Sequence, residues 1–514
     1  MRDSLDPVVA APDRARLLQN VYPLDPFTGS AVVGRPGSQQ AGSQLGASGK
    51  RTGQLIYEYT KRDGTTKTVA IVGGQGIYTY NWSTEAWSQV VTVANLTTAS
   101  ITLSETARCY GVTFTDNLVI SDGVNKPFMW DGTSGAGGLT LLSTSPVLYG
   151  QPVVYYAKLF GIKDTERSTL VWSEENDATI GYENGGYNNA WTLGQTNSEG
   201  FYALCPTDEA LYCFRARSIT KVSGAVTPEF STSGTREAVS EDVGTASPAS
   251  VIRTSNGNIY FTDSLGRPQG ILPGGGLMDP PVWTDVRETV RGVDIGASVL
   301  ATAQSWYDPE TRTVGLGFAE LGQLACTASI QVSPQTSEPV GVFRGFTFDR
   351  IGTVYNVSMR RVVMHLSTDG YAFEHGTEDG DLWDDGSTAI AHAVTSMPVG
   401  FDTEVDKHWT KLNLSLRIAS NMTLAVAYET PRGNNTAQSL SASVSGGYSL
   451  VDVAVVGTDR ISSGSWLEAH QDVGWNGFGR WLSWSVSHET AGERFGLAMA
   501  TAVARPLSAA AGVP

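Results

Sequence analysis

Short β-rich blocks recur along this chain at a nearly regular interval, and this recurrence restricts the possible folds more than any other feature. Five clear blocks begin at residues 112, 153, 209, 251 and 345, about 40 to 55 residues apart with one gap roughly twice as long. Several blocks share one order, in which a strand and a polar turn precede a strand with an aromatic residue or Ile and an exit with Gly or Trp. That interval is typical of the four-stranded blades of β-propellers. The sequence therefore predicts a β-propeller-like repeat body, with stacked β-sandwiches as the alternative.

Composition and turn signals support an all-β fold. The 514 residues include 57 Gly, 13 Trp and 19 Tyr, with 41% hydrophobic and only 17% charged residues. The Asp63-Gly64 pair separates two β-rich runs, at residues 54–59 and 68–72, which is a strong hairpin signal. A chain of this length exceeds one hydrophobic core, so more than one unit is expected.

Four segments follow from the changes in pattern. Residues 1–50 are predicted to form an extended N-terminal arm with one helix-capable piece at residues 14–19, and residues 51–375 the propeller-like body. Residues 376–505 contain longer alternating strands, such as the one holding Leu412, Leu414, Leu416 and Ile418, which predict a C-terminal antiparallel β-sandwich. Further strands are expected at residues 449–456, 481–487 and 495–500, a frayed tail at 506–514, and a weak helix near 285–291.

Net charge and hydropathy limit the partners. The formal charge of -16 repels phosphate backbones and anionic lipids, so tight duplex binding or a membrane-surface role is disfavoured, whereas an acidic lumen along which DNA slides is compatible. No apolar stretch approaches the length that a membrane-spanning helix requires, and the opening residues lack the apolar region of a signal peptide. We expect no membrane span and synthesis in a cytoplasm.

The cysteines and histidines give no metal or disulfide pattern. Cys109, Cys205, Cys213 and Cys326 are widely spaced without a Cys-x-x-Cys pair, so buried free thiols are expected. All six histidines follow residue 360, but no His-x-His, His-x-x-x-His or His-Glu-x-x-His spacing occurs.

Three groups of residues are candidates for sites. The Gly46–Arg51 segment lacks the first glycine and the hydroxyl of a phosphate-binding loop, which favours a flexible segment. The acidic cluster at residues 374–386, which contains His375, could bind a hard cation, but its spacing differs from an EF-hand and a solvated pair of turns is favoured. Packing between blades is favoured over a sugar-binding face for a set of five tryptophans, Trp82, Trp87, Trp130, Trp172 and Trp191.

No nucleophile motif stands between a strand and a helix, and paired carboxylates for glycoside hydrolysis cannot be recognised from spacing alone. The sequence therefore predicts a protein that is not an enzyme. It identifies no catalytic residue, no cofactor-binding residue and no metal ligand, and it predicts no cofactor.

The chain resembles the β-propeller tail proteins of tailed bacteriophages. The likeness lies in the order of many short segments over most of the chain and not in one diagnostic motif. These segments are residues 19–23 (QNVYP), 33–38 (VGRPGS), 159–162 (LFGI), 170–174 (LVWSE), 191–194 (WTLG), 210–224 (ALYCFRARSITKVSG), 242–252 (DVGTASPASVI), 257–263 (GNIYFTD), 370–376 (GYAFEHG), 385–390 (DGSTAI) and 407–412 (KHWTKL).

This resemblance implies a virion structural protein of the viral tail, made and assembled in the bacterial host cytoplasm. It implies a homo-oligomer, a hexamer forming a ring that serves as the tail nozzle or hub of a short-tailed phage. The ring would contact the portal and head-to-tail adaptor on one side and carry tail fibres or spikes, and DNA would pass through it non-specifically during genome ejection.

Two alternatives remain open. A tail-tip or baseplate protein of a long-tailed phage could have the same blades and composition. A host-glycan-binding propeller, or less readily a glycan-cleaving one, belongs to a different functional class and would depend on exposed aromatic residues.

Overall fold

The fold is nearly all β in the part of the chain that the computed structural model describes. Two short α-helices occur there, α1 (Val93–Thr98) and α2 (Phe230–Ser233). Neither of them has the length and apolar character of a membrane span. The described residues are 15–23, 32–35, 37–183, 187–193, 199–224, 226, 230–279, 282, 302–309, 311–320, 323, 325–376, 384–385, 388–396, 406–418, 422–434, 438–442, 467–490 and 496–506.

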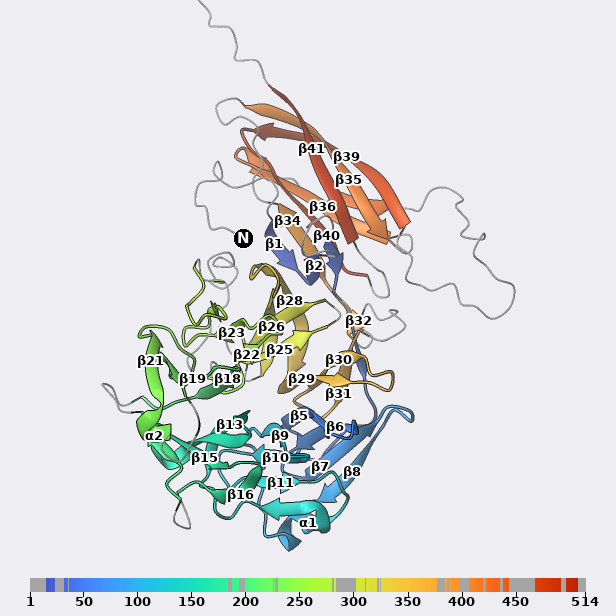
Figure 1. Cartoon of the computed structure of the whole chain (residues 1–514). Helices are drawn as coiled ribbons and strands as arrows, with labels where there is room; N and C mark the ends of the chain where they lie inside the picture. The colour runs from blue at the N-terminus through green and yellow to red at the C-terminus, as the bar shows by residue number, and fades with distance from the viewer. Residues whose placement is uncertain are drawn as a thin grey trace, which may run out of the picture.

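Seven groups of largely antiparallel strands, called blades 1 to 7 here, follow one another along the described middle of the chain (Figure 1). Blades 1 to 3 consist of β5 (Gly53–Thr60), β6 (Thr66–Val72), β7 (Gly76–Asn81) and β8 (Ala86–Thr92); β9 (Tyr110–Phe114), β10 (Asn117–Ser121), β11 (Phe128–Trp130) and β12 (Leu139–Leu141); and β13 (Leu148–Tyr155), β14 (Lys158–Lys163), β15 (Thr169–Glu174), β16 (Asp177–Gly181) and β17 (Ala190–Thr192).

Blades 4 to 6 consist of β18 (Ala203–Pro206), β19 (Ala210–Phe214), β20 (Ile219–Ser223) and β21 (Thr235–Ser240); β22 (Ile252–Arg253), β23 (Ile259–Thr262) and β24 (Pro268–Ile271); and β25 (Gln304–Asp308), β26 (Thr313–Phe318), β27 (Cys326–Val332) and β28 (Pro339–Phe348). Blade 7 consists of β29 (Arg350–Tyr355), β30 (Arg361–Leu366), β31 (Ala372–His375) and the N-terminal strand β4 (Ser38–Gln40), beside which lie β32 (Asp384–Asp385) and β33 (Thr388–Ala389).

The first strands of the blades meet around a common axis. β5 contacts β9, β9 contacts β13 and β13 contacts β18, while β22 contacts β25, β25 contacts β29, and β29 returns to β5. Blades 4 and 5 share a core in which the Phe214 and Phe261 ring centroids lie 5.2 Å apart. Since this circuit closes, the body is propeller-like, and the prediction of an all-β, propeller-like fold is confirmed.

Aromatic side chains fill the space between the blades. Trp130 and Trp172 are fully buried, and the Trp172 ring stacks on Phe160 with a centroid distance of 5.4 Å. Trp82 and Trp87 pack against the core shared by blades 1 and 7, and Trp191 packs against the core shared by blades 3 and 4. All three are partly buried. The interpretation of these tryptophans as packing residues is confirmed, and the fully buried Trp130 and Trp172 are excluded from a sugar-binding face.

A strand from the beginning of the chain completes the last blade. In β4, Ser38, Gln39 and Gln40 pair antiparallel with His375, Glu374 and Phe373 of β31. The backbone N–H of Ala41 donates to Ala372 O at 2.8 Å, which extends this pairing. The outer edge of blade 7 is therefore covered, as edge strands require if they are not to pair with other chains.

Two facing sheets form a sandwich beside the propeller (Figure 1). Its core contains Trp409, Leu412, Leu414 and Leu424, each at most 1% exposed, and the alternation predicted for this region is confirmed. One sheet contains β1 (Ala15–Gln19), β34 (His392–Ser396), β40 (Ser483–His488), β36 (Met422–Thr430), β37 (Gly433–Asn434) and β38 (Gln438–Ala442), and the other contains β2 (Val21–Pro23), β3 (Val32–Gly34), β41 (Gly496–Pro506), β35 (Lys407–Ile418) and β39 (Leu467–Gly479).

The helix-capable reading of residues 14–19 is wrong, because residues 15–19 form strand β1. Leu18 pairs with Val394 of β34, and Gln19 pairs with Ala393 of β34 and with Val342 of β28. Pairing on both sides outweighs a weak local helix preference. The helix expected near residues 285–291 and the strand at 449–456 lie outside the described residues, as does the predicted tail at 506–514 except for its first residue, which ends β41.

The same pairing joins the propeller and the sandwich into one continuous sheet from β25 to β36. Next to β1, Asn20 is 2% exposed and has a left-handed φ of 54°. Its Oδ1 accepts from Arg344 N at 2.6 Å and from Arg35 Nε at 3.2 Å, and its Nδ2 donates to Ala391 O at 2.8 Å. Asn20 thus connects blade 6, the N-terminal segment and the chain leading into β34.

Candidate functional site

A cavity of about 450 Å³ lies on the propeller axis. Its walls come mainly from the first strands of six blades, β5, β9, β13, β22, β25 and β29. These strands converge because they are the innermost members of their sheets, so their backbones and alternate side chains face the axis. The volume falls in the range of roughly 300–1,000 Å³ that is usual for small-molecule sites.

Arg350, the first residue of β29, lies at the end of the cavity where the inner strands begin. It is 4% exposed. Its Nε donates to Gln54 O at 2.7 Å and its Nη2 to Cys109 O at 2.8 Å, while its guanidinium lies 4.8 Å from the Tyr110 ring centroid. Burial, and next the charge of Arg108, lower the pKa of Arg350 to about 10. A guanidinium held in this way remains charged near neutral pH.

Glu58, Arg253 and Arg361 lie where the inner strands end. Burial raises the pKa of Glu58, and the opposing effects are the hydrogen bond from Thr60 and the charge of Arg361. The Arg361 Nε donates to the Tyr355 hydroxyl at 2.9 Å. Both ends of the cavity therefore carry charged side chains.

The Arg253 guanidinium has a separate acidic partner. It makes a bidentate pair with Asp208, at 3.2 and 3.0 Å. Asp208 lines a second pocket of about 310 Å³ between blades 4 and 5, to which Arg253 also belongs.

Neutral polar groups lie along the cavity wall. The Tyr57 hydroxyl accepts from Thr113 N at 2.9 Å, and Ser305 and Gln151 are half-buried on the opposite strands. Burial raises the pKa of Tyr57, so its hydroxyl keeps its proton. These groups offer hydrogen bonds but no chemistry that requires a base.

The described residues that line the cavity form no arrangement that resembles a catalytic centre. Glu58 is the one carboxylate among the described lining residues, and burial raises the pKa of the Cys109 thiol, which keeps it protonated and poorly nucleophilic. Within the described ranges, no three His, Cys, Asp or Glu side chains are placed to share a metal ion. The geometry is suited to binding, through cations and neutral polar groups.

The segment weighed as a phosphate-binding loop is a turn at the start of blade 1. Gly46 has a φ of 78°, and a Cβ there would lie 2.3 Å from Lys50 O, so a glycine is required for close backbone approach. Lys50 pairs with Glu105. The lysine is thus engaged in the fold, which disfavours a nucleotide site. The flexibility expected for this Gly/Ser segment stays a prediction.

The acidic cluster at residues 374–386 is described only in part, since residues 377–383 and 386 lie outside the described residues. Glu374 and His375 belong to β31, and Asp384 and Asp385 to β32. Strands β31 and β32 flank β4 on opposite sides, and Glu374 pairs with Gln39 while Asp385 pairs with Ser38. Nothing in this placement brings three ligands together.

His375 is paired with another histidine that sequence reasoning did not connect with it. His375 Nε2 and His365 Nδ1 lie 2.6 Å apart, because β30 and β31 are neighbours. Desolvation, and next the charge of Arg35, lower the pKa of His375 to about 3. The ring is therefore neutral at physiological pH and acts in packing against Phe346.

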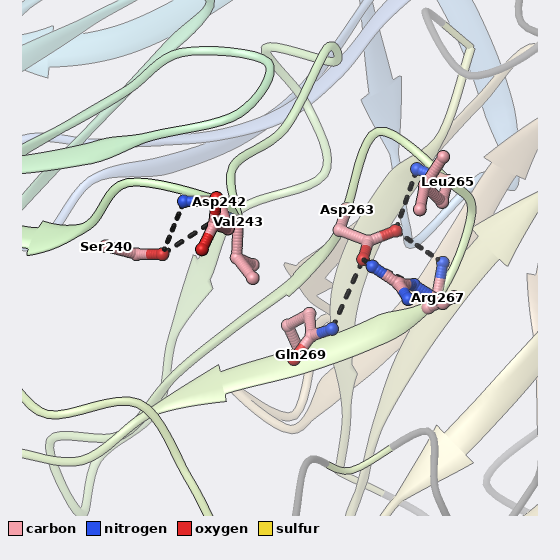
Figure 2. A network of polar contacts seen from close by, with 7 residues as sticks. All are labelled: Ser240, Asp242, Val243, Asp263, Leu265, Arg267 and Gln269. Carbon is pink, nitrogen blue, oxygen red and sulfur yellow. Dashed lines mark hydrogen bonds and ion pairs between the residues drawn. The ribbon is translucent and has the colours of Figure 1, made fainter.

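A buried aspartate organises the turn between β23 and β24 (Figure 2). Asp263 is 2% exposed and accepts hydrogen bonds from Leu265 N at 2.8 Å and from Arg267 N at 2.9 Å. Its other oxygen accepts from Arg267 Nε at 2.8 Å and Gln269 Nε2 at 3.2 Å. Asp122 caps the matching turn of blade 2 by accepting from Val124 N and Asn125 N. These carboxylates are structural.

The four cysteines are buried and free, as the sequence predicted. Burial is the largest cause that raises the pKa of each thiol.

Comparison with known proteins adds little to these observations. No family model matches the chain, and no curated protein matches it. Among solved structures, the WD40 β-propeller domain of Doa1 covers 67% of this chain and 99% of its own length, at 9% identity and a TM-score of 0.42. A likeness at this level carries no functional argument, and the fold assignment depends on the strand pairing described above.

Proposed function

We propose that this chain is a structural subunit of a bacteriophage tail, which assembles into a hexameric ring as the nozzle or hub of a short-tailed phage. The observation that supports this most directly is the path of the N-terminal segment. β1, β2 and β3 belong to the sandwich, whereas β4 completes blade 7 of the propeller. Two units joined by shared strands resist relative rotation, which suits a subunit that must keep its shape in an assembly under pressure.

The propeller axis is not the path for DNA in this proposal. The axial cavity measures about 450 Å³ and has Arg350 at one end. The major groove of B-DNA is about 12 Å wide and the whole duplex is wider still. A duplex is therefore too large for the axial cavity of one propeller. The channel would lie between the copies of a ring, where the net charge of -16 disfavours adhesion of phosphate groups.

The remaining parts of the proposal follow the same assembly. The ring would contact adaptor or portal proteins on one side and fibres or spikes on its outside, and the protein would reside in the virion tail after assembly in the host cytoplasm. A tail-tip or baseplate role in a long-tailed phage is the nearest alternative, because the same rigid subunit could serve there.

Electron microscopy of the purified full chain at micromolar concentration, with mass photometry alongside, tests the proposal. We expect closed rings with sixfold symmetry and a central channel. Stacked tubes or a threefold tip complex would favour the long-tailed alternative. A monomer that persists at all concentrations and in the presence of adaptor proteins would refute the ring.

A binding propeller is the second candidate, favoured by the size and polarity of the axial cavity. Glycan-array binding by the monomer would support this function. The fully buried Trp130 and Trp172 cannot contribute a stacking surface, so such binding would have to depend on other residues.

A further inference from the structure

The side chains around the axial cavity carry an excess of positive charge in a strongly acidic protein. Among the described lining residues, three are basic (Arg253, Arg350 and Arg361) and one, Glu58, is acidic. The whole chain, in contrast, has 51 acidic and 35 basic residues. A local inversion of charge inside a concave site concentrates anions there, because the surrounding low-dielectric walls strengthen the field.

The three arginines differ in how their charge is balanced. Arg253 is neutralised by its bidentate pair with Asp208, and Arg361 faces the charge of Glu58. Arg350 makes no ion pair in the described part of the chain. Its hydrogen bonds go to two backbone carbonyls and to Tyr110. Its charge is compensated in part by the adjacent Asp349 carboxylate, whose pKa is raised by burial and lowered by the charges of Arg108 and Arg350. A buried charge that is only partly compensated favours a further anion.

Arg350 also retains free donors. A guanidinium has five N–H groups, and the contacts with Gln54 O, Cys109 O and Tyr110 use three of them. The carbonyl contacts fix the plane of the guanidinium against β5 and β9. A guanidinium that is held in a fixed orientation and has two donors left can bind carboxylate or phosphate oxygens.

We propose that the axial cavity binds a small oxyanion, a molecule with a carboxylate or phosphate group, through Arg350. The anion would lie at the end of the cavity where Arg350 meets Tyr110. Gln151 would supply a neutral hydrogen bond from β13. The volume of about 450 Å³ limits the ligand to a small molecule. This inference is independent of the proposed tail function, since a single propeller contains the whole site.

Isothermal titration of the full chain with citrate and with inorganic phosphate, at constant pH and ionic strength, tests the site. We expect one molecule bound per chain, and the stronger of the two probes identifies the preferred oxyanion. Arg350→Met removes the charged donors, for which a loss of roughly ten- to hundredfold in affinity is expected. Gln151→Trp fills the cavity without changing an arginine and is expected to abolish binding.

Arg215→Met is the matched control. Arg215 is also a buried arginine, 6% exposed, whose guanidinium donates to the carbonyl oxygens of Glu199 and Leu193 and lies over the Phe201 ring, but it does not line the axial cavity. We expect this variant to lose stability and to bind the probe with unchanged affinity. If Arg350→Met does not fold, the affinity of Gln151→Trp for the probe still tests whether the anion binds in the axial cavity. Absence of binding by the wild-type chain, or binding that survives both cavity variants, would overturn the proposal and leave a hydrated channel.

Discussion

Replacement of Asn20 by glycine would show how much the joint between propeller and sandwich contributes to stability. Glycine accepts the φ of 54° but removes the acceptor for Arg344 N and the donor for Ala391 O. Each of these partly buried backbone groups then lacks its hydrogen-bond partner, which destabilises the folded state by about 1–2 kcal/mol for each group. We expect Asn20→Gly to lower the free energy of unfolding by about 2–4 kcal/mol.

Two further substitutions separate the hydrogen bonds from the backbone conformation. Asn20→Ala loses the same bonds and adds about 1 kcal/mol for an alanine with left-handed φ. Asn176 provides a matched control, because it has a φ of 58° in the turn between β15 and β16 and an exposed side chain. We expect Asn176→Ala to cost only the backbone term, about 1 kcal/mol.

Urea unfolding at pH 7, followed by tryptophan fluorescence, measures these differences through the transition midpoints and slopes. Limited proteolysis of the folded variants adds a structural readout, because loosening of the joint should release propeller and sandwich as separate fragments. The reasoning would be refuted by an Asn20→Gly protein whose stability lies within about 0.5 kcal/mol of the wild type, since surface substitutions have effects of that size.

Three other outcomes are expected. The pKa of His375 is lowered to about 3 in the folded chain, so between about pH 3 and 6.5 the unfolded chain binds one proton more than the folded chain. The free energy of unfolding should therefore fall by up to about 2 kcal/mol from pH 6.5 to 5. Urea titrations of His375→Gln should show a weaker dependence of stability on pH. Asp263→Ala should destabilise by about 3 kcal/mol through the loss of its turn (Figure 2), whereas the exposed Asp242→Ala should change stability by less than about 0.5 kcal/mol. A thiol reagent should label none of the four cysteines in the native protein and all of them in urea, and labelling of the native state would contradict their burial.

Local signals predicted the blades well because their strands pair with neighbours in sequence. The Asp63-Gly64 turn marks the hairpin of β5 and β6, and alternation marks β35 and β36. The blade spacing is visible for the same reason, since blades 1, 2, 4, 5 and 6 are meanders in which each strand pairs with the next strand along the chain.

The N-terminal segment escaped prediction because its partners are distant. Residues 15–19 have little intrinsic preference, and their conformation is decided by β34, which follows the whole propeller in the chain. The axial cavity was missed for a related reason. Arg350, Gln54 and Cys109 meet only when the ring closes, and no spacing in the sequence indicates that an arginine at the start of one strand will face the beginnings of two others.

The use of β4 as the last strand of blade 7 has a consequence for the order of events during synthesis. Its partner β31 begins at Ala372, so six complete blades are translated between the two strands. At a translation rate of about 5–20 residues per second, β4 remains without its partner strand for roughly 15 to 70 s. During that interval a β4 segment from a neighbouring nascent chain on the same messenger could complete the blade instead. Polysome density, as well as sequence, therefore influences whether each propeller closes on itself or exchanges its first strand with a sister chain.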